Sequence, residues 1–444
     1  MKYGLIGEKL GHSFSKPIHE SIADYTYELK EIAKENLDTF MKAKEFCGIN
    51  VTIPYKADVI PYLDYVDPNA DKIGAVNTVV NRDGKLYGYN TDFGGMKALI
   101  ENAGFDLKGK KVLILGSGGT SKTANAVSES LGAREIITVS RSGEVNYENA
   151  ADLHKDCDYI INTTPCGMYP DNDTFAIEPS LFPELKGIVD VVYNPIETAI
   201  VRKGRENGVK GVTGLYMLVS QAVLASEHFT GDKFDVKRVT DEVFRKILSE
   251  KQNIVLIGMP GSGKSTIGRA LSEKTGKAFI DTDDIIVENH GVISDIFEKY
   301  GESYFRDIES EAVKEVSKQS GIIIATGGGA ILRKENVDAL KQNGVIFFVE
   351  RDLKKLTTTN RPISKSVGIE KLYSERLPLY IDFSDRRIYN NSTAENAANE
   401  IIKTINNSNF KDIHITSKEK NITRPTGLRV IKLPPQPSKL TEFL

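Results

Sequence analysis

The chain has 444 residues, a length that suits roughly three domains of ordinary size. Its hydrophobic residues make up 40% and its charged residues 27%, a balance typical of globular proteins. The net charge is −3, which argues against nucleic acid or a membrane surface as the main partner, because either would need clustered basic residues.

The number and spacing of the cysteines and the length of the apolar runs indicate in which cellular compartment the protein lies. Cys47, Cys157 and Cys166 form no C-x-x-C pair, and their odd number suits a reducing cytosol better than a disulfide framework. No apolar run approaches the ~18 residues of a membrane span, and the N-terminus lacks the apolar core of a signal peptide. The histidines have no metal-ligand spacing. We therefore predict a cytoplasmic protein without a membrane span or a zinc site.

Short apolar runs alternate with longer amphipathic stretches, which predicts an α/β fold of buried parallel strands flanked by helices. The predicted strands are KVLILG (111–116), EIITVS (135–140), DYIINTT (158–164), GIVDVVY (187–193), NIVLIG (253–258), GIIIATGGG (321–329) and VIFFVE (345–350). A helical stretch over 240–252 runs directly into the strand at 253, so we expect two closely apposed halves. Residues 408–444 lose this periodicity and are expected to form an extension.

The first glycine-rich loop follows the strand at 111 and has the sequence GSGGTSKTA. Such a loop places backbone N–H groups at a helix N-terminus, where they can bind a pyrophosphate. The third glycine position holds Ser121, so an ordinary strand–helix turn is an alternative. The next predicted strand ends in Ser140-Arg141-Ser142 without an acidic residue, which favours NADP over NAD. A solvated surface cation is the alternative for Arg141.

Upstream of this loop lie polar clusters, which indicate a site for a small polyhydroxylated acid. They comprise Ser13, Ser15, Asn50, Thr52, Lys56, Asn77 and Asp92. Reducing a ketone with hydride requires a proton donor beside the new alkoxide, and a lysine near a carboxylate can supply it. For any one of these residues alone, surface solvation is the alternative.

The ordered motifs GHSFS, NVTIPYK, GAVNT, GYNTD, GSGGTSK, NTTPCGM, DVVYNP and GLYMLVSQ resemble those of shikimate dehydrogenase. The resemblance implies a substrate domain at 1–93 plus 215–248 around a Rossmann-like NADP domain at 94–214, with Lys56 and Asp92 as the catalytic pair. The implied shikimate contacts are Ser13, Ser15, Thr52, Lys56, Asn77, Asp92, Tyr193 and Gln221. The implied NADP contacts are Gly116, Ser117, Gly118, Gly119, Thr120, Ser140, Arg141, Ser142, Val191 and Gly214.

Two departures from that family lie near the serines. Lys16 follows Ser15, so that Pro17 comes one position later than usual, and Glu20 stands where an asparagine is common. Both could shift the serine segment and so the substrate preference.

The second glycine-rich loop, GMPGSGKS, follows the strand at 253 and matches the G-x-x-x-x-G-K-S pattern. This spacing indicates a nucleotide triphosphate with Mg²⁺, with Lys264 at the β/γ-phosphates and Ser265 at the metal. In FIDTDD, Asp281 and Asp283 are expected to alternate along a strand end and to point to one side, one toward the metal and one toward a substrate hydroxyl.

Arginines and a triple glycine follow. Arg306, Arg361 and Arg376 could bind a carboxylate or phosphates through paired hydrogen bonds, and Gly327 to Gly329 follow a predicted strand. For each arginine or aspartate alone, a surface charge is the alternative.

Taken together, the motifs of residues 250–407 resemble those of shikimate kinase. The resemblance implies a kinase domain that spans residues 249–407. The resemblance implies Asp283, Arg306, Gly328 and Arg376 at shikimate, with Asp283 orienting or deprotonating the attacking hydroxyl. It implies Gly261, Ser262, Gly263, Lys264, Ser265, Thr266 and Arg361 at ATP, and Ser265 and Asp281 at Mg²⁺. Arg361 would lie in a lid, where Lys354 or Lys355 replaces the family's other arginine.

Together the two resemblances predict a bifunctional enzyme of aromatic amino-acid biosynthesis with NADP(H), ATP and Mg²⁺ as cofactors. It would reduce 3-dehydroshikimate and phosphorylate the product. Two alternatives are a non-catalytic shikimate or quinate sensor and an NAD-dependent quinate/shikimate dehydrogenase with a kinase domain. A different small-molecule kinase would have to account for Arg306 and the triple glycine. The sequence predicts no oligomeric state.

Overall fold

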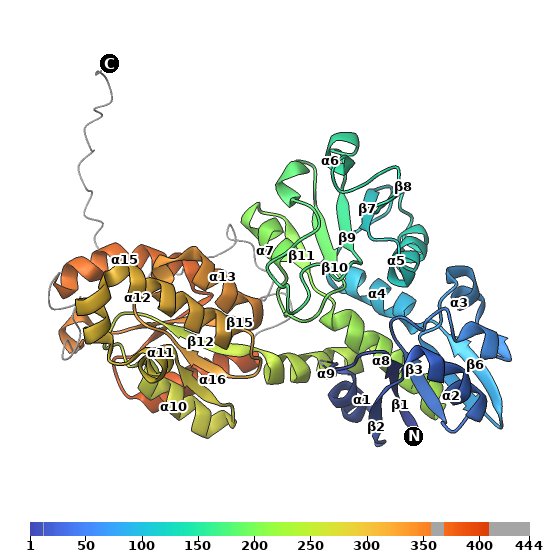
Figure 1. Ribbon diagram of the computed structural model, residues 1–444, viewed down its shortest axis with the longest axis horizontal. Coiled ribbons are helices and arrows are strands. Elements are labelled where there is room, and N and C mark those ends of the chain that lie inside the picture. Colours follow the sequence, from blue (N-terminus) through green and yellow to red (C-terminus); the bar gives the residue numbers. More distant parts are fainter. Residues whose placement is uncertain (12, 357–367, 408–444) are drawn as a thin grey trace, which may run out of the picture.

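The structure is a computed structural model that describes residues 1–11, 13–356 and 368–407. These residues form three β-sheets with helices on their faces, two sheets in the first half of the chain and one in the second (Figure 1). None of the helices among them has both the length and the apolar character to cross a membrane. The predicted extension at 408–444 lies outside the described residues.

The first sheet is mixed and has the strand order β2-β1-β3-β5-β6-β4. Its strands are β1 (Tyr3–Gly7), β2 (Tyr27–Glu31), β3 (Gly48–Val51), β4 (Tyr65–Val66), β5 (Thr78–Arg82) and β6 (Lys85–Tyr89). Its helices are α1 (Ser15–Ile22), α2 (Leu37–Ala43) and α3 (Pro68–Ile73). The strand β5 runs antiparallel to β3 and β6, joined to β6 by a tight turn, while β1 is parallel to both its neighbours.

The second sheet is wholly parallel and has the order β11-β10-β9-β7-β8. Its strands are β7 (Lys111–Leu115), β8 (Glu135–Val139), β9 (Tyr159–Asn162), β10 (Gly187–Asp190) and β11 (Lys210–Val212). The helices around it are α4 (Thr91–Asn102), α5 (Gly119–Ser130), α6 (Ala150–Leu153), α7 (Ala199–Glu206), α8 (Leu215–Thr230) and α9 (Val236–Lys251).

The third sheet is also wholly parallel, in the order β13-β14-β12-β15-β16. Its strands are β12 (Asn253–Ile257), β13 (Phe279–Asp281), β14 (Ile323–Ala325), β15 (Gly344–Glu350) and β16 (Arg386–Tyr389). Its helices are α10 (Lys264–Thr275), α11 (Thr282–His290), α12 (Ile293–Ser317), α13 (Lys334–Asn343), α15 (Ile369–Phe383) and α16 (Ala394–Asn407). The α12 helix is kinked at Gly301, which has a positive φ of 81°.

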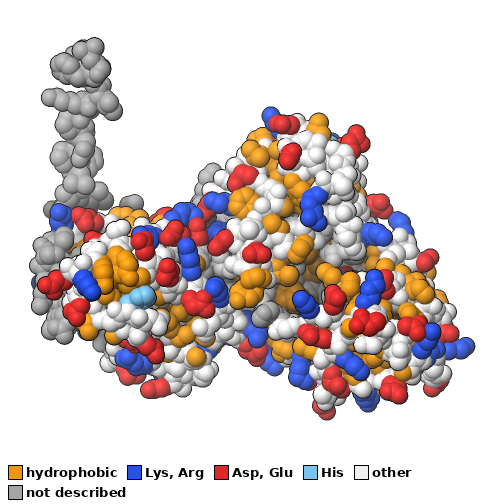
Figure 2. Space-filling model, in the orientation of Figure 1, with side chains coloured by type: hydrophobic (Ala, Val, Ile, Leu, Met, Phe, Trp, Pro, Cys, Tyr) orange, Lys and Arg blue, Asp and Glu red, His pale blue; other side chains and the backbone are white. Residues whose placement is uncertain are grey.

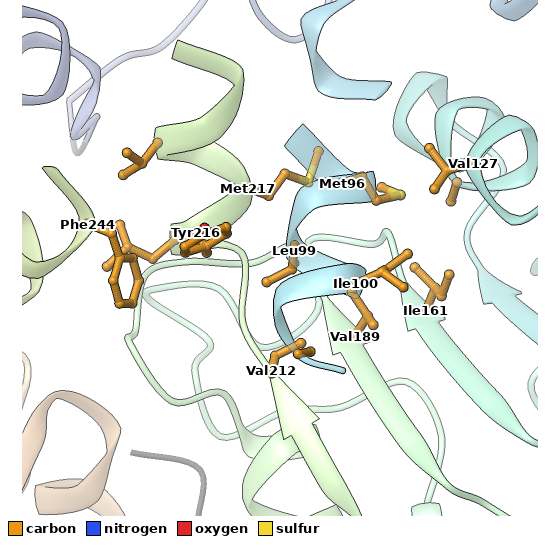
Figure 3. Packing of buried hydrophobic residues seen from close by; sticks show 14 of the residues in the cluster. Met96, Leu99, Ile100, Val127, Ile161, Val189, Val212, Tyr216, Met217 and Phe244 are labelled. Atoms are coloured by element: carbon orange, nitrogen blue, oxygen red, sulfur yellow. The ribbon is translucent and has the colours of Figure 1, made fainter. Parts of the chain in front are cut away.

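Helices α4 and α8 lie between the first and second sheets and share one apolar core with the second. Met96, Leu99 and Ile100 of α4 recur at helical spacing and are fully buried against β9, β10 and β11 (Figure 3). A Cβ at Gly95 would come within 2.7 Å of the Met217 carbonyl oxygen, so this glycine allows the two helices to approach closely. The pair therefore connects the two sheets of the first half.

The two halves meet without an intervening loop. Helix α9 ends at Lys251 and β12 begins at Asn253, so only Gln252 separates them. A second contact joins α13 to α7 (Figure 1). There the Nε atom of the buried Arg202 of α7 lies 3.7 Å from the Oδ1 atom of Asp338 of α13. On the face shown in Figure 2, acidic and basic side chains are mixed along this junction and over the rest of the surface.

The predicted α/β class is confirmed, and every strand predicted from an apolar run is present with its end shifted by a few residues at most. The mixed first sheet was not predicted, because several of its strands, such as the largely exposed β2, contain charged residues and form no continuous apolar run. The helix expected over 240–252 corresponds to α9.

Candidate active sites

The predicted catalytic pair of the first half is in contact. Lys56 lies in the turn after β3 and Asp92 in the first turn of α4, and their Nζ and Oδ2 atoms are 2.6 Å apart. The Lys56 side chain is 18% exposed and that of Asp92 11% exposed, so both remain accessible to a small molecule. The carboxylate stabilises the ammonium group and fixes its position.

Beside this pair lies a network of buried amides and hydroxyls. The Asn77 Nδ2 donates to Thr91 Oγ1 at 3.0 Å, and the Thr91 backbone N–H donates to Asn77 Oδ1 at 2.7 Å. Gln221 of α8 places its Oε1 within 3.4 Å of Asn77 Nδ2 and 3.3 Å of Thr91 Oγ1. The structure therefore brings Asn77 and Gln221 together from opposite ends of the first half. Thr91 was missed in the sequence, although it directly precedes Asp92 in GYNTD.

The two serines flank a buried phenylalanine at the start of α1. The Ser15 backbone N–H donates to Ser13 Oγ at 3.2 Å, and the Phe14 ring lies 5.3 Å from that of Tyr193. Burial raises the pKa of Tyr193 above its ordinary value, so its hydroxyl, which is neutral near pH 7 in any case, remains a hydrogen-bond donor at more alkaline pH as well. Thr52, half-buried directly after β3, packs its methyl group close to Gly7.

The two departures from the family pattern near these serines contact each other. Lys16 and Glu20 lie one turn apart on α1, and their Nζ and Oε1 atoms are 2.5 Å apart. This ion pair lies on the exposed side of the helix, whereas Ser15 is buried on the opposite side.

The first glycine-rich loop links β7 to α5, as expected for a dinucleotide site. Gly116 has a φ of 108°, and a Cβ there would come within 2.9 Å of Thr163 Oγ1, so this position requires glycine. Ser117, Gly118 and Gly119 are exposed, so their backbone N–H groups are open to a phosphate at the helix N-terminus. Thr120 follows in the first turn of α5.

The remaining predicted NADP residues lie at two places around this loop. Ser140, Arg141 and Ser142 form the turn after β8, where Arg141 is exposed. Val191 follows β10, and a Cβ at Gly214 would overlap its carbonyl oxygen, so Gly214 allows β10 and α8 to approach. These groups all lie at the carboxyl ends of parallel strands, where open α/β sheets bind cofactors.

The second glycine-rich loop encloses its lysine. Lys264, the first residue of α10, is buried, and its Nζ donates to the carbonyl oxygens of Gly258 at 2.9 Å and Met259 at 3.1 Å. Asn390, which follows β16, donates its Nδ2 to the Ser262 carbonyl at 2.7 Å and so fixes the loop from the opposite side. The sequence analysis missed Asn390, because nothing near it in sequence belongs to the loop. The predicted ATP residues Gly261, Ser262, Gly263, Lys264, Ser265 and Thr266 all lie in this turn and the start of α10.

The predicted metal ligands are adjacent. Ser265 Oγ donates to Asp281 Oδ2 at 2.6 Å, which places two hard oxygen ligands beside the phosphate loop, as Mg²⁺ requires. The expected alternation of Asp281 and Asp283 along a strand is wrong, because β13 ends at Asp281 and Asp283 lies in the first turn of α11. Among the described residues there is no cluster of three or more His, Cys, Asp or Glu that could hold a metal by itself.

Arg306 and Arg376 converge on the triple glycine. The Arg376 Nη1 donates to the Gly328 carbonyl at 3.0 Å, and a Cβ at Gly329 would overlap the Arg306 guanidinium. Asp283 lies across the same segment, since a Cβ at Gly327 would come within 2.7 Å of its Oδ1. The structure thus brings together the residues predicted from four separate motifs.

The sequence analysis missed Glu309, which lies one turn after Arg306 on α12. Its Oε2 accepts from Arg306 Nη1 at 2.6 Å, and its side chain is only 1% exposed. Burial raises the pKa of Glu309 above its ordinary value. Burial alone would lower the pKa of Arg306, but the neighbouring Glu309 carboxylate outweighs this effect and raises it. The signal in the sequence that could have revealed this pair is the spacing of three residues between Arg306 and Glu309, which places two side chains next to each other on a helix.

The lid residue Arg361 lies outside the described residues. Of the two lysines considered there, Lys355 donates to the Asn391 carbonyl at 2.9 Å and both are exposed.

Models of two protein families match this chain. The model of the shikimate dehydrogenase substrate-binding domain matches residues 5–79, and that of shikimate kinase matches residues 260–406. The first range contains Lys56 and Asn77, and the second contains the phosphate loop and the arginine cluster.

Curated relatives cover the first half of the chain. The NADP⁺-dependent shikimate dehydrogenase of Clostridium perfringens strain SM101 is 38% identical over 266 residues, which are 55% of this chain and 97% of the relative. That of Methanosphaera stadtmanae is 36% identical over 258 residues, 51% of this chain and 90% of the relative.

Solved structures give the same result. Shikimate dehydrogenase 1 from Peptoclostridium difficile is similar with a TM-score of 0.52 and 36% identity, over 56% of this chain and 98% of its own. A chorismate mutase/shikimate dehydrogenase fusion from Clostridium acetobutylicum has a TM-score of 0.52 and 38% identity, over 55% of this chain and 96% of its own. This chain therefore belongs to the shikimate dehydrogenase family through its first half and has a shikimate kinase domain in its second half.

Proposed function

We infer that the chain is a bifunctional enzyme that reduces 3-dehydroshikimate with NADPH and then phosphorylates shikimate with ATP. The single observation that supports this best is the pair of small polar sites, one beside each phosphate loop. The first combines Lys56 and Asp92 with neutral amides, and the second combines Arg306 and Arg376 with Asp283. Both suit a small hydroxylated carboxylic acid, and with the two family matches this supports shikimate as the product of the first site and the substrate of the second.

In the dehydrogenase half, residues 1–251, NADPH supplies the hydride when it is bound. Lys56 holds a proton at Nζ beside the position proposed for the ketone oxygen and stabilises the developing alkoxide, while Asp92 keeps the ammonium group in place. Asn77 and Gln221 orient the hydroxyl groups. The exposed Arg141 accounts for a 2′-phosphate and hence for NADP rather than NAD.

In the kinase half, residues 253–407, ATP would supply the phosphoryl group when bound, and Mg²⁺ would neutralise charge on its phosphates. Asp283 accepts the proton of the attacking hydroxyl, and Arg306 and Arg376 bind the substrate carboxylate. Lys264 stabilises charge on the β/γ-phosphates, and Ser265 and Asp281 would hold the metal. The lid role of Arg361 is part of this proposal.

The proposed domains are a substrate domain (1–93 plus 215–248), an NADP domain (94–214) and a kinase domain (249–407). The three sheets support this division. A cytoplasmic location is proposed from the three cysteines, none of which forms a disulfide in the described part of the chain. Small molecules are the proposed partners, not nucleic acid or membranes.

The test is incubation with 3-dehydroshikimate, NADPH, ATP and Mg²⁺, with both products followed by chromatography. Wild type should form shikimate 3-phosphate. Lys56→Ala should lower shikimate formation by about 10²- to 10⁴-fold and leave phosphorylation of added shikimate unchanged. Ligand binding without NADPH oxidation would instead support a sensor, and activity with NAD⁺ equal to that with NADP⁺ would support a quinate/shikimate dehydrogenase.

A further inference from the structure

The junction between the halves contacts the serine segment of the dehydrogenase site. Lys251, the last residue of α9, places its Nζ 4.9 Å from the centre of the Phe14 ring. Phe14 is buried between Ser13 and Ser15, two proposed substrate ligands. The Lys251 carbonyl accepts a hydrogen bond from the Gly321 N–H at 2.8 Å, just before β14. The backbone that positions this cation is therefore held by the kinase sheet.

A second contact reaches the segment that follows Tyr193. The Ile196 N–H donates to Asn343 Oδ1 at 3.1 Å, and the Glu197 N–H donates to the Gln342 carbonyl at 2.8 Å. Gln342 and Asn343 are the last residues of α13, the helix of the kinase half that lies beside α7 (Figure 1).

The Gln342 side chain lies across a neighbouring loop of the dehydrogenase half. Its Nε2 donates to Asp173 Oδ1 at 2.6 Å, and its Oε1 accepts from Asn172. Gln342 is 2% exposed and Asn343 4% exposed. Buried polar groups with partners fix one register of an interface, because any shift leaves them unpaired.

The segment from β10 to α7 is short and internally held. The fully buried carboxylate of Asp190 accepts from the Val192 N–H at 3.1 Å and from Thr198 Oγ1 at 2.6 Å. Asp190 thereby joins the two ends of the segment that contains Tyr193. A displacement at Ile196 is consequently transmitted to Tyr193, whose ring faces Phe14.

We propose that the kinase half positions the substrate-binding side of the dehydrogenase site, through Lys251 on Phe14 and through Gln342 and Asn343 on the segment after Tyr193. Lys251 and Asn343 are positioning residues that act through Phe14 and Tyr193. Their function is to keep Ser13, Ser15 and Tyr193 in one arrangement for the hydroxy acid. The proposal rests on the dehydrogenase function proposed above.

The first test is Lys251→Met in the full chain, assayed as shikimate oxidation with NADP⁺ and without ATP. The KM for shikimate should rise about three- to tenfold, with kcat and the KM for NADP⁺ within about twofold of wild type. Lys251→Arg, which retains a cation over the ring, should restore the KM. Lys246→Met is the matched control, because Lys246 lies on the same helix but contacts Ser21.

The second test is Asn343→Ala, which removes the side-chain oxygen that accepts the hydrogen bond from the Ile196 N–H. The KM for shikimate in the dehydrogenase assay should again rise about three- to tenfold, while both kinase constants stay unchanged. Lys334→Met is its control, because it breaks an exposed pair with Glu206 across the same junction. Rates are measured rather than equilibrium binding, because both halves would bind shikimate.

An unchanged KM in both Lys251→Met and Asn343→Ala would overturn the proposal. A parallel loss of kcat and of kinase activity would also overturn it, because that pattern reports a general folding defect. If wild type oxidised no shikimate with NADP⁺, the proposed dehydrogenase function itself would be wrong.

Discussion

The two phosphate loops of this chain follow the same strand–turn–helix plan and differ in where their positive charge lies. The loop before α5 has three exposed residues, Ser117 to Gly119, and no lysine within the turn. The loop before α10 surrounds the buried Lys264, which donates to two of its carbonyls, and Asn390 holds it from outside. One loop offers backbone N–H groups alone, and the other adds a full charge.

This difference corresponds to the phosphates that each loop would bind. A dinucleotide pyrophosphate lies between two nucleosides and does not react, so backbone donors and a helix dipole are sufficient. The charge that we propose for the NADP 2′-phosphate lies instead at Arg141, beyond the next strand. A γ-phosphate that is transferred develops charge in the reaction, which favours a lysine and a metal at the loop itself.

Removal of divalent cations should produce the largest difference between the activities that depend on the two loops. Excess EDTA should abolish shikimate phosphorylation, because it removes the Mg²⁺ that Ser265 and Asp281 are proposed to hold and that neutralises the triphosphate charge. NADP⁺-dependent shikimate oxidation in the same sample should be unaffected. Added Mg²⁺ should restore the kinase rate, and a dehydrogenase that also stopped would show that the metal has a structural role outside the second loop.

Lys264→Ala tests the charge of the second loop directly. We expect kcat for phosphorylation to fall by about 10²- to 10³-fold, as for removal of a group that stabilises transition-state charge. The dehydrogenase should keep its wild-type kcat. Lys274→Ala is the control, because Lys274 is exposed at the far end of the same helix. A fall of less than tenfold would show that the buried lysine mainly supports the loop.

Most strands of the parallel sheets were predictable because they lie in apolar runs such as Val112 to Leu115, whereas the short β11 and β16 were not predicted. The first sheet was harder to predict. Strand β2 has one buried residue, Tyr27, followed by four exposed ones, so no apolar run marks it. Its pairing with β1 depends on contacts that no local pattern contains.

The site residues show a similar division. Motifs predicted Lys56 with Asp92 and Ser265 with Asp281, and the structure brings each pair into contact. Thr91, Glu309 and Asn390 were missed, because each acts through a partner distant in sequence or one helical turn away. The position of Asp283 on a helix was also missed, since a strand end and a helix start have similar polar sequences.

Arg141→Gln tests where the charge of the first loop lies. The ratio of kcat/KM for NADP⁺ to that for NAD⁺ should fall about 10- to 100-fold, the loss expected for one charge-assisted contact to phosphate. Because Arg141 is exposed, the effect should weaken at high salt. Arg134→Gln, an exposed arginine just before the same strand, should leave the ratio unchanged. An unchanged ratio in Arg141→Gln would assign NADP selectivity to other residues.

Gly116→Ala should have the smallest effect and tests whether the open first loop depends on backbone conformation. The residue has a φ of 108°, and its new methyl group would meet Thr163, so we expect a loss of about 1–3 kcal/mol in unfolding free energy. Gly118→Ala is the control, since Gly118 has a φ of −79° and open space at its Cβ. Thermal unfolding measures both. Equal stability of the two variants would show that the turn does not require glycine at position 116. The exposure of the loop residues Ser117 to Gly119 would then have to be explained by other contacts.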